Sequence, residues 1–218
     1  ASSFVLHGFL LSLLNWAAFV IIGMLLLKPY FSIFSASSEV ANMGIIYLRI
    51  ILIGSVAPFI ENVAVKILQA AGNSVSPMIF QSFAAVINLI LDPLFIWGFG
   101  VIPQMGISGA AIATVFAQFI SAALSVFTVF FRQNILRISL LKFHISPKYI
   151  KEIFITGLPS VLGMALVSVY ISGLNAILSS FSEEAVSSLG VYYKLQTILL
   201  IPTYGLNQGI TPVLSYNF

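Results

Sequence analysis

Long apolar runs separated by short polar breaks dominate this sequence, and six of the runs are long enough to cross a membrane. A helix needs about 20 mostly apolar residues to span the hydrocarbon core of a bilayer. Dividing the sequence at its polar and Gly/Pro breaks gives candidate spans over residues 8–27, 40–70, 77–99, 106–131, 153–178 and 185–214. We therefore predict six transmembrane helices.

Features within these spans predict their local shape. The second span is long, so it must tilt, kink or extend past the bilayer, and Pro58 offers a kink. Ser76 is the expected N-cap of the third span, with Pro77 in its first turn. Small residues at the start of the fourth span allow close helix packing: Gly106, Gly109, Ala110, Ala111 and Ala113. The sixth span is interrupted by Pro202, Gly205 and Pro212.

A closed β-barrel is the other architecture that satisfies every backbone group in lipid. Its strands would alternate apolar and polar residues over segments of about ten residues. The runs at 50–53 and 89–91 are continuously apolar instead. The pattern therefore favours an all-α integral membrane protein.

The composition excludes a water-soluble domain. Of the 218 residues, 60% are hydrophobic and only 7% are charged, whereas a soluble domain has about 25% charged residues. The apolar excess must face lipid, so the lipid bilayer is the first expected partner. The net charge of +3 lies on no folded polar face, and we expect no nucleic-acid partner.

The distribution of basic residues predicts the orientation. With six spans, one side of the membrane receives Lys66 and a cluster in the longest polar loop, 132–152: Arg132, Arg137, Lys142, Lys148 and Lys151. Because cytoplasmic loops are enriched in Lys and Arg, we place this loop and both chain ends in the cytoplasm. The protein is then a multi-pass protein of the cell membrane.

Enzyme chemistry has few candidate residues. The chain has no cysteine and only two histidines, His7 and His144, both near polar ends or loops. It lacks a Gly-rich phosphate loop, a paired-histidine metal motif and a Gly-x-Ser-x-Gly elbow. We therefore predict that the protein is not an enzyme. The chain starts at Ala1 rather than Met, and we interpret it as a piece of a longer protein.

Asp92 is the main candidate for a functional charge, because an ionisable residue inside a span is costly. Asn88 precedes it by four residues, so both side chains project from one helix face. A carboxylate and an amide oxygen are hard ligands for a small cation such as Na⁺, and the carboxylate can also take a proton. Pro93 leaves the Leu89 carbonyl without its usual donor. The alternative is that Asp92 lies at the outer interface, about 10 Å from the end of its span.

The remaining polar residues of the spans have weaker interpretations. We expect Glu61 near the cytoplasmic end of its span, partly paired with Lys66, and Glu152 in the first helical turn of the fifth span. The uncharged polar residues of the spans either bridge helices or line a substrate cavity: Thr114, Gln118, Asn175, Gln196, Asn207 and Gln208. Asn207 and Gln208 lie in the interrupted sixth span.

Several of these segments, in order, resemble the multidrug and toxic compound extrusion (MATE) family, and the last resembles its MepA-type branch. They are the stretch 68–74 followed by Pro77, the Asn88-x-x-x-Asp92-Pro93 motif, the small-residue run 106–114, the stretch 157–160, and 205–218. The resemblance implies twelve helices in two lobes, of which this chain holds about the third to the eighth. Residues 1–131 would belong to the N-lobe, 132–152 to the inter-lobe loop, and 153–218 to the C-lobe.

The resemblance also implies a function. Family members export amphipathic, often cationic drugs by antiport with Na⁺ or H⁺, so we expect a coupling ion and no other cofactor. Asp92 and Asn88 match the fifth-helix carboxylate and amide of the family's N-lobe cation site, and Thr114 resembles the sixth-helix hydroxyl. The alternatives are a flippase for lipid-linked saccharides, a non-transporting receptor or scaffold and, least favoured, a membrane-embedded enzyme.

Overall fold

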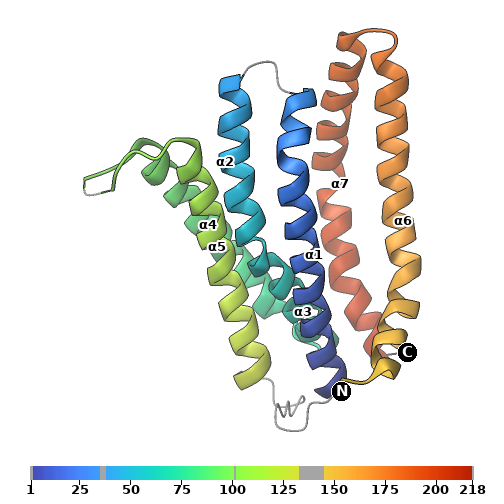
Figure 1. Ribbon diagram of the computed structural model, residues 1–218. Helices are drawn as coiled ribbons and strands as arrows, with labels where there is room; N and C mark the ends of the chain where they lie inside the picture. The colour runs from blue at the N-terminus through green and yellow to red at the C-terminus, as the bar shows by residue number, and fades with distance from the viewer. Residues whose placement is uncertain (1, 35–37, 101, 133–144, 218) are drawn as a thin grey trace. The chain divides into compact units, whose positions relative to one another are not determined.

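The computed structural model describes residues 2–34, 38–100, 102–132 and 145–217, and these are helical almost throughout. The elements run in the order α1 (Ser2–Phe34), α2 (Ser38–Gly54), α3 (Val56–Ala70), α4 (Val75–Trp97), α5 (Ile107–Phe127), a π-helical turn η1 (Thr128–Arg132), α6 (Pro147–Ser179) and α7 (Glu183–Asn217). The chain forms two compact units, Ala1–His144 and Ile145–Phe218. Figure 1 shows the helices of each unit.

The predicted all-α membrane architecture is confirmed. In the described residues, four stretches are long and apolar enough to cross a bilayer, and the α2–α3 pair adds a fifth if it counts as one bent span: Ser3–Ser32, Val75–Trp97, Ile107–Arg132 and Pro147–Leu178, with Ser38–Gly54 plus Val56–Ala70. The sixth predicted span coincides with α7, which is long but richer in polar residues and lies outside this set. The protein is therefore a multi-pass membrane protein.

The bend in the second span lies at Ser55, between α2 and α3, and measures 40°. Pro58 explains its position, because a proline has no N–H to donate to the carbonyl four residues earlier, here that of Gly54. At the bend itself, Ser55 Oγ donates to the Leu52 carbonyl at 2.7 Å. The kink predicted from Pro58 therefore lies about one turn before the proline.

The start of α4 corrects one prediction. The helix begins at Val75, and Ser76 lies inside it. Ser74 is the N-cap residue, and its neighbour Asn73 supplies the capping hydrogen bond, because Asn73 Oδ1 accepts from the backbone N–H of Ser76 at 3.1 Å. Pro77 lies in the first turn, as predicted.

Close approach of backbones holds α4 and α5 together as a hairpin (Figure 1). The backbone N–H groups of Met105 and Gly106 donate to the carbonyls of Phe95 and Ile96 at the end of α4. A Cβ on Gly109 would lie 2.4 Å from the Phe95 carbonyl oxygen, so only glycine fits there. The predicted role of the small residues at the start of α5 is thereby confirmed.

Helix α5 is the centre of the first unit, packing against α2, α3 and α4. Near its end, Ala64 and Leu68 of α3 and Val129 of η1 form a fully buried apolar cluster. Phe9 of α1 packs on Phe130 beside that cluster, with 5.8 Å between ring centroids. These contacts fix the register between α3 and α5, and this register sets the geometry of the site described below.

The second unit consists of α6 and α7, which pack against each other and are joined by a short turn (Figure 1). Two predictions need correction here. Since α6 begins at Pro147, Glu152 lies in its second turn rather than its first. Helix α7 runs without interruption through Pro202, Gly205 and Pro212, because each proline removes only one backbone hydrogen bond. Outside the spans, hydrogen bonds from its own backbone and from Ser182 lower the pKa of Glu184.

Candidate functional site

Two helices present matching stripes of side chains to a pocket of about 250 Å³ in the first unit. On α4 the stripe is Gln81, Ala84, Ala85 and Asn88, and on α5 it is Thr114, Ala117, Gln118 and Ser121. Both follow the spacing i, i+3, i+4, i+7, which places residues on one helix face. Glu61 of α3 completes the lining.

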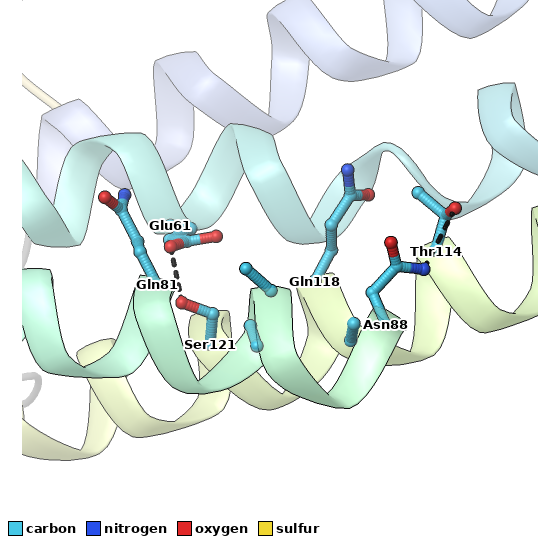
Figure 2. Close-up of a pocket in the computed structure, with 9 residues that line it drawn as sticks. Glu61, Gln81, Asn88, Thr114, Gln118 and Ser121 are labelled. Atoms are coloured by element: carbon cyan, nitrogen blue, oxygen red, sulfur yellow. Dashed lines mark hydrogen bonds between the residues drawn. The ribbon is translucent and has the colours of Figure 1, made fainter. Parts of the chain in front are cut away.

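Small residues in the middle of the stripes create the space, and polar residues give it its character. Ala84 and Ala117 are buried and have short side chains, which leave room between the helices. Figure 2 shows Glu61 and Ser121 together at one end, Asn88 and Thr114 at the other, and Gln118 between them. The pocket therefore has two polar ends.

The predicted trio of Asp92, Asn88 and Thr114 comes together at the second end. Asn88 Nδ2 donates to Asp92 Oδ1 at 3.0 Å and to Thr114 Oγ1 at 3.4 Å. Thr114 Oγ1 in turn donates to the Ala110 carbonyl at 3.0 Å. Because α4 extends to Trp97, Asp92 lies within the helix and is half-buried, one turn beyond the pocket lining.

The oxygen atoms at this end suit a small hard cation. Asp92 supplies a carboxylate, and Asn88 and Thr114 supply an amide oxygen and a hydroxyl. Pro93 cannot donate to the Leu89 carbonyl, so that oxygen is available as well. Neither α4 nor α5 carries a basic side chain, so both helices contribute only negative or neutral groups. In the described residues, no group of three or more His, Cys, Asp or Glu side chains could hold a metal ion. The donor set therefore fits Na⁺ or a proton better than a transition metal.

Glu61 departs from its prediction. It is buried, with 8% of its surface exposed, and its Oε1 accepts a hydrogen bond from Ser121 Oγ at 2.6 Å. Lys66, its expected partner, donates to Gln69 Oε1 at 3.2 Å instead. The helical register explains the difference, because residues five apart do not share a helix face. The expected Glu61–Lys66 pair is therefore wrong.

The other predicted cavity residues divide between the two units. Gln118 lines the pocket. Asn175 lies on α6, and Gln196, Asn207 and Gln208 lie on α7, in the second unit. That unit has its own pocket of about 370 Å³, lined by Tyr193, Lys194, Thr197 and Ile198. A substrate-binding role for these residues remains a prediction.

Among the polar lining residues, sequence reasoning missed two, Gln81 and Ser121. Each had a readable signal, since Gln81 precedes Asn88 by seven residues and Ser121 follows Thr114 by seven. Two helical turns separate each pair, so each shares a face with a residue already singled out.

Comparison with known proteins gives consistent matches. The model of the MatE family matches residues 1–94. Among curated proteins, an FAD transporter of Shewanella oneidensis is 26% identical over 217 residues, covering all of this chain and 48% of that protein. The multidrug export protein MepA of Staphylococcus haemolyticus is 28% identical over 189 residues, covering 86% of this chain and 40% of that protein.

Solved structures agree with these relatives. A crystal structure of MATE in the bent conformation matches with a TM-score of 0.86 and 25% identity, covering 98% of this chain and 47% of that one. The chain thus spans about half the length of the proteins that it matches.

Proposed function

We propose that this chain, which belongs to the multidrug and toxic compound extrusion family, contributes the N-lobe cation site of a secondary active exporter in the cell membrane. Members of that family are transporters rather than enzymes. Asp92, Asn88 and Thr114 would bind the coupling ion, Na⁺ or H⁺. The exported compounds would be amphipathic drugs, often organic cations. The hydrogen-bonded trio at one end of the α4–α5 pocket carries this proposal.

The coupling step follows from the cost of charge in a membrane. An ionised carboxylate away from water is expensive, and binding of Na⁺ or a proton to Asp92 removes that cost. Before the cation binds, Asn88 donates to the ionised carboxylate of Asp92. After it binds, Asn88 and the cation both contact that carboxylate. Pro93 follows directly in the helix and weakens it locally, so a change at Asp92 can alter the bend of α4.

The relatives indicate a class of substrate for this protein but no single compound. One is called a multidrug export protein and another an FAD transporter, so related chains serve different molecules. The acidic and neutral lining of the pocket supports cationic cargo. A flippase for lipid-linked saccharides would need basic side chains to hold pyrophosphate, and neither α4 nor α5 has one. We therefore do not favour the flippase, nor a receptor that moves no substrate.

The first prediction concerns Asp92. In proteoliposomes that contain the full-length gene product, a cationic dye should be expelled when a Na⁺ or pH gradient is imposed. Asp92→Asn should slow this efflux by at least about tenfold, which corresponds to about 1.4 kcal/mol in the activation free energy of transport. The exposed Glu39, in the first turn of α2, provides the matched control, because Glu39→Gln also removes one carboxylate.

Monodisperse elution of both variants in detergent, and equal amounts of each protein in the purified proteoliposomes, make the comparison valid. Whichever gradient drives the wild type identifies the coupling ion. Wild-type efflux from the Asp92→Asn variant would contradict the proposal.

A further inference from the structure

Glu61 is a buried acidic group that the Asp92 site does not use. Ser121 is its hydrogen-bond partner in the described part of the chain, where the structure pairs it with no basic residue. A buried carboxylate without a cationic partner is costly in a medium of low dielectric constant. Inside a membrane span, such a group is a functional hypothesis.

Ser125 adds an independent observation. Its side chain is fully buried, and among the described residues its hydroxyl has no hydrogen-bond partner. Leaving such a group unpaired costs about 1–3 kcal/mol. Ser125 follows Ser121 by one helical turn, and residues four apart have Cβ atoms about 5–6 Å apart on one face. One water molecule can bridge two hydroxyls at that separation.

The hydrogen bond from Ser121 to Glu61, with the buried Ser125 hydroxyl one turn further along α5, outlines a polar path that ends at a carboxylate. We propose that Glu61 is a second proton-binding group, which takes up its proton through the hydroxyls of Ser121 and Ser125. The site lies at the opposite end of the pocket from Asn88 and Thr114 (Figure 2). This inference rests on the proposed transport function, in which the additional proton would be released and taken up once per cycle.

The proton transfer balances with water alone. A hydronium ion gives one proton to the ionised Glu61 carboxylate, an O–H bond forms on the carboxyl group, and a water molecule remains. The reverse step returns the proton to water. Ser121 donates to Oε1, so a relay through its hydroxyl passes the Ser121 proton to Oε1, and the Ser121 oxygen receives a proton in turn from the water on its other side.

The surroundings of Glu61 favour a proton over a metal ion. A hard metal cation needs several oxygen ligands around it. Gln81 and Ser121 are the polar residues labelled beside Glu61 in Figure 2, and in the described residues only Ser121 hydrogen-bonds to the carboxylate. The lining also includes Ala84 and Ala117, whose side chains offer no ligand. A proton needs only one carboxylate oxygen.

Other titratable groups on the helices packed against α3 define the competing explanations. Helix α5 has none, and on α4 the acid is Asp92, beyond the opposite end of the pocket. The groups on α1, α2 and η1 lie outside the pocket lining: His7, Lys28, Tyr30, Glu39, Tyr47, Arg49 and Arg132. His7 is the strongest competitor, because it is fully buried and its neighbour Gly8 lies against Val63.

Infrared difference spectroscopy tests the proposal without requiring transport. The purified full-length gene product is titrated in Na⁺-free buffer, and the carbonyl band of protonated carboxyl groups is followed. Glu61→Gln should remove one component of this band, and Asp92→Asn a different one. Glu39→Gln is the exposed control and His7→Gln the competing one, and both should keep the Glu61 component.

A milder variant guards against misfolding. Ser121→Ala keeps the carboxylate and removes its hydrogen bond, so it should shift the Glu61 component without abolishing it. The proposal is overturned if Glu61→Gln retains every component, if His7→Gln removes the component instead, if Ser121→Ala leaves it unshifted, or if Na⁺ displaces it at constant pH. A Glu61 component in a wild-type protein that shows no ion-driven efflux would instead reject the transport function and keep the proton site.

Discussion

Asn88 is the residue that joins the two helices at the proposed cation site. Its amide nitrogen donates both to Asp92 on its own helix and to Thr114 on α5. An amide has only two N–H donors, so both are used in these contacts and its oxygen is left for a ligand. The geometry of the site therefore depends on Thr114 as an acceptor as well as on the carboxylate.

Replacing Thr114 tests this dependence. Thr114→Val keeps the side-chain volume and removes the hydroxyl, so one Asn88 donor loses its partner. We expect a loss of about 1 kcal/mol in stability, typical of one hydrogen bond, and weaker cation dependence of efflux. Thr114→Ser keeps the hydroxyl and should behave nearly as the wild type. Thermal unfolding in detergent measures the first effect and the half-saturating cation concentration measures the second. Identical behaviour of the valine and serine variants would contradict this role.

At the residue scale, local pairs were predictable and distant ones were not. Asn88 and Asp92 are four apart, so the helix period alone places them together. Thr114 required the family resemblance. The pair of Glu61 and Ser121 joins residues sixty positions apart, and only the packing of α3 on α5 brings them into contact. Lys66 misled the prediction because it is close to Glu61 in sequence.

At the element scale, the helical type followed from hydropathy, as did four of the six predicted spans, or five with the bent α2–α3 pair. The ends of the helices followed from side-chain details. The bend at Ser55 precedes Pro58 because the proline acts on the carbonyl four residues earlier. Helix α4 starts earlier than predicted because Asn73, rather than Ser76, supplies its capping hydrogen bond. The π-helical turn Thr128–Arg132 at the end of α5 has no signal in the apolar pattern.

Gly109 gives a prediction at this scale, since it sets the distance between α4 and α5. A methyl group there would meet the Phe95 carbonyl at 2.4 Å, and this backbone atom cannot rotate away. Gly109→Ala should therefore destabilise the protein by about 1–3 kcal/mol, as overpacking does. Gly8→Ala is the matched control, because its nearest neighbour is the Val63 Cγ1 atom at 3.4 Å, an ordinary contact. The measurement is the unfolding temperature of each purified variant; equal temperatures would show that α4 can shift.

At the scale of the whole molecule, both units have large apolar side chains exposed on their surfaces. Large apolar side chains lie exposed along α6, including Leu162, Met164, Leu166 and Val169, as expected for helices that face lipid or further protein. The sequence predicted the membrane class and the family. It could not predict the substrate, because the chain spans only about half the length of its relatives.

The packing of the first unit helps to predict how the protein is oriented in the membrane. Leu68 packs with Val129, and Phe9 with Phe130, so the ends of α3 and η1 lie at one end of the unit with the start of α1. Lys66 and Arg132 belong to that end, whereas Lys28 lies near the far end of α1. The first end should face the cytoplasm, because the longest basic loop follows it.

Single cysteines can test this orientation, because the sequence itself contains no cysteine. Lys28, Lys66 and Lys148 are all exposed, so each accepts a cysteine without disturbing the packing. In the full-length gene product, with any further cysteines replaced, a membrane-impermeant maleimide should label Lys28→Cys on intact cells. Lys66→Cys and Lys148→Cys should react only after the cells are permeabilised. Labelling of Lys148→Cys on intact cells would place the basic loop outside the cell and contradict the predicted orientation.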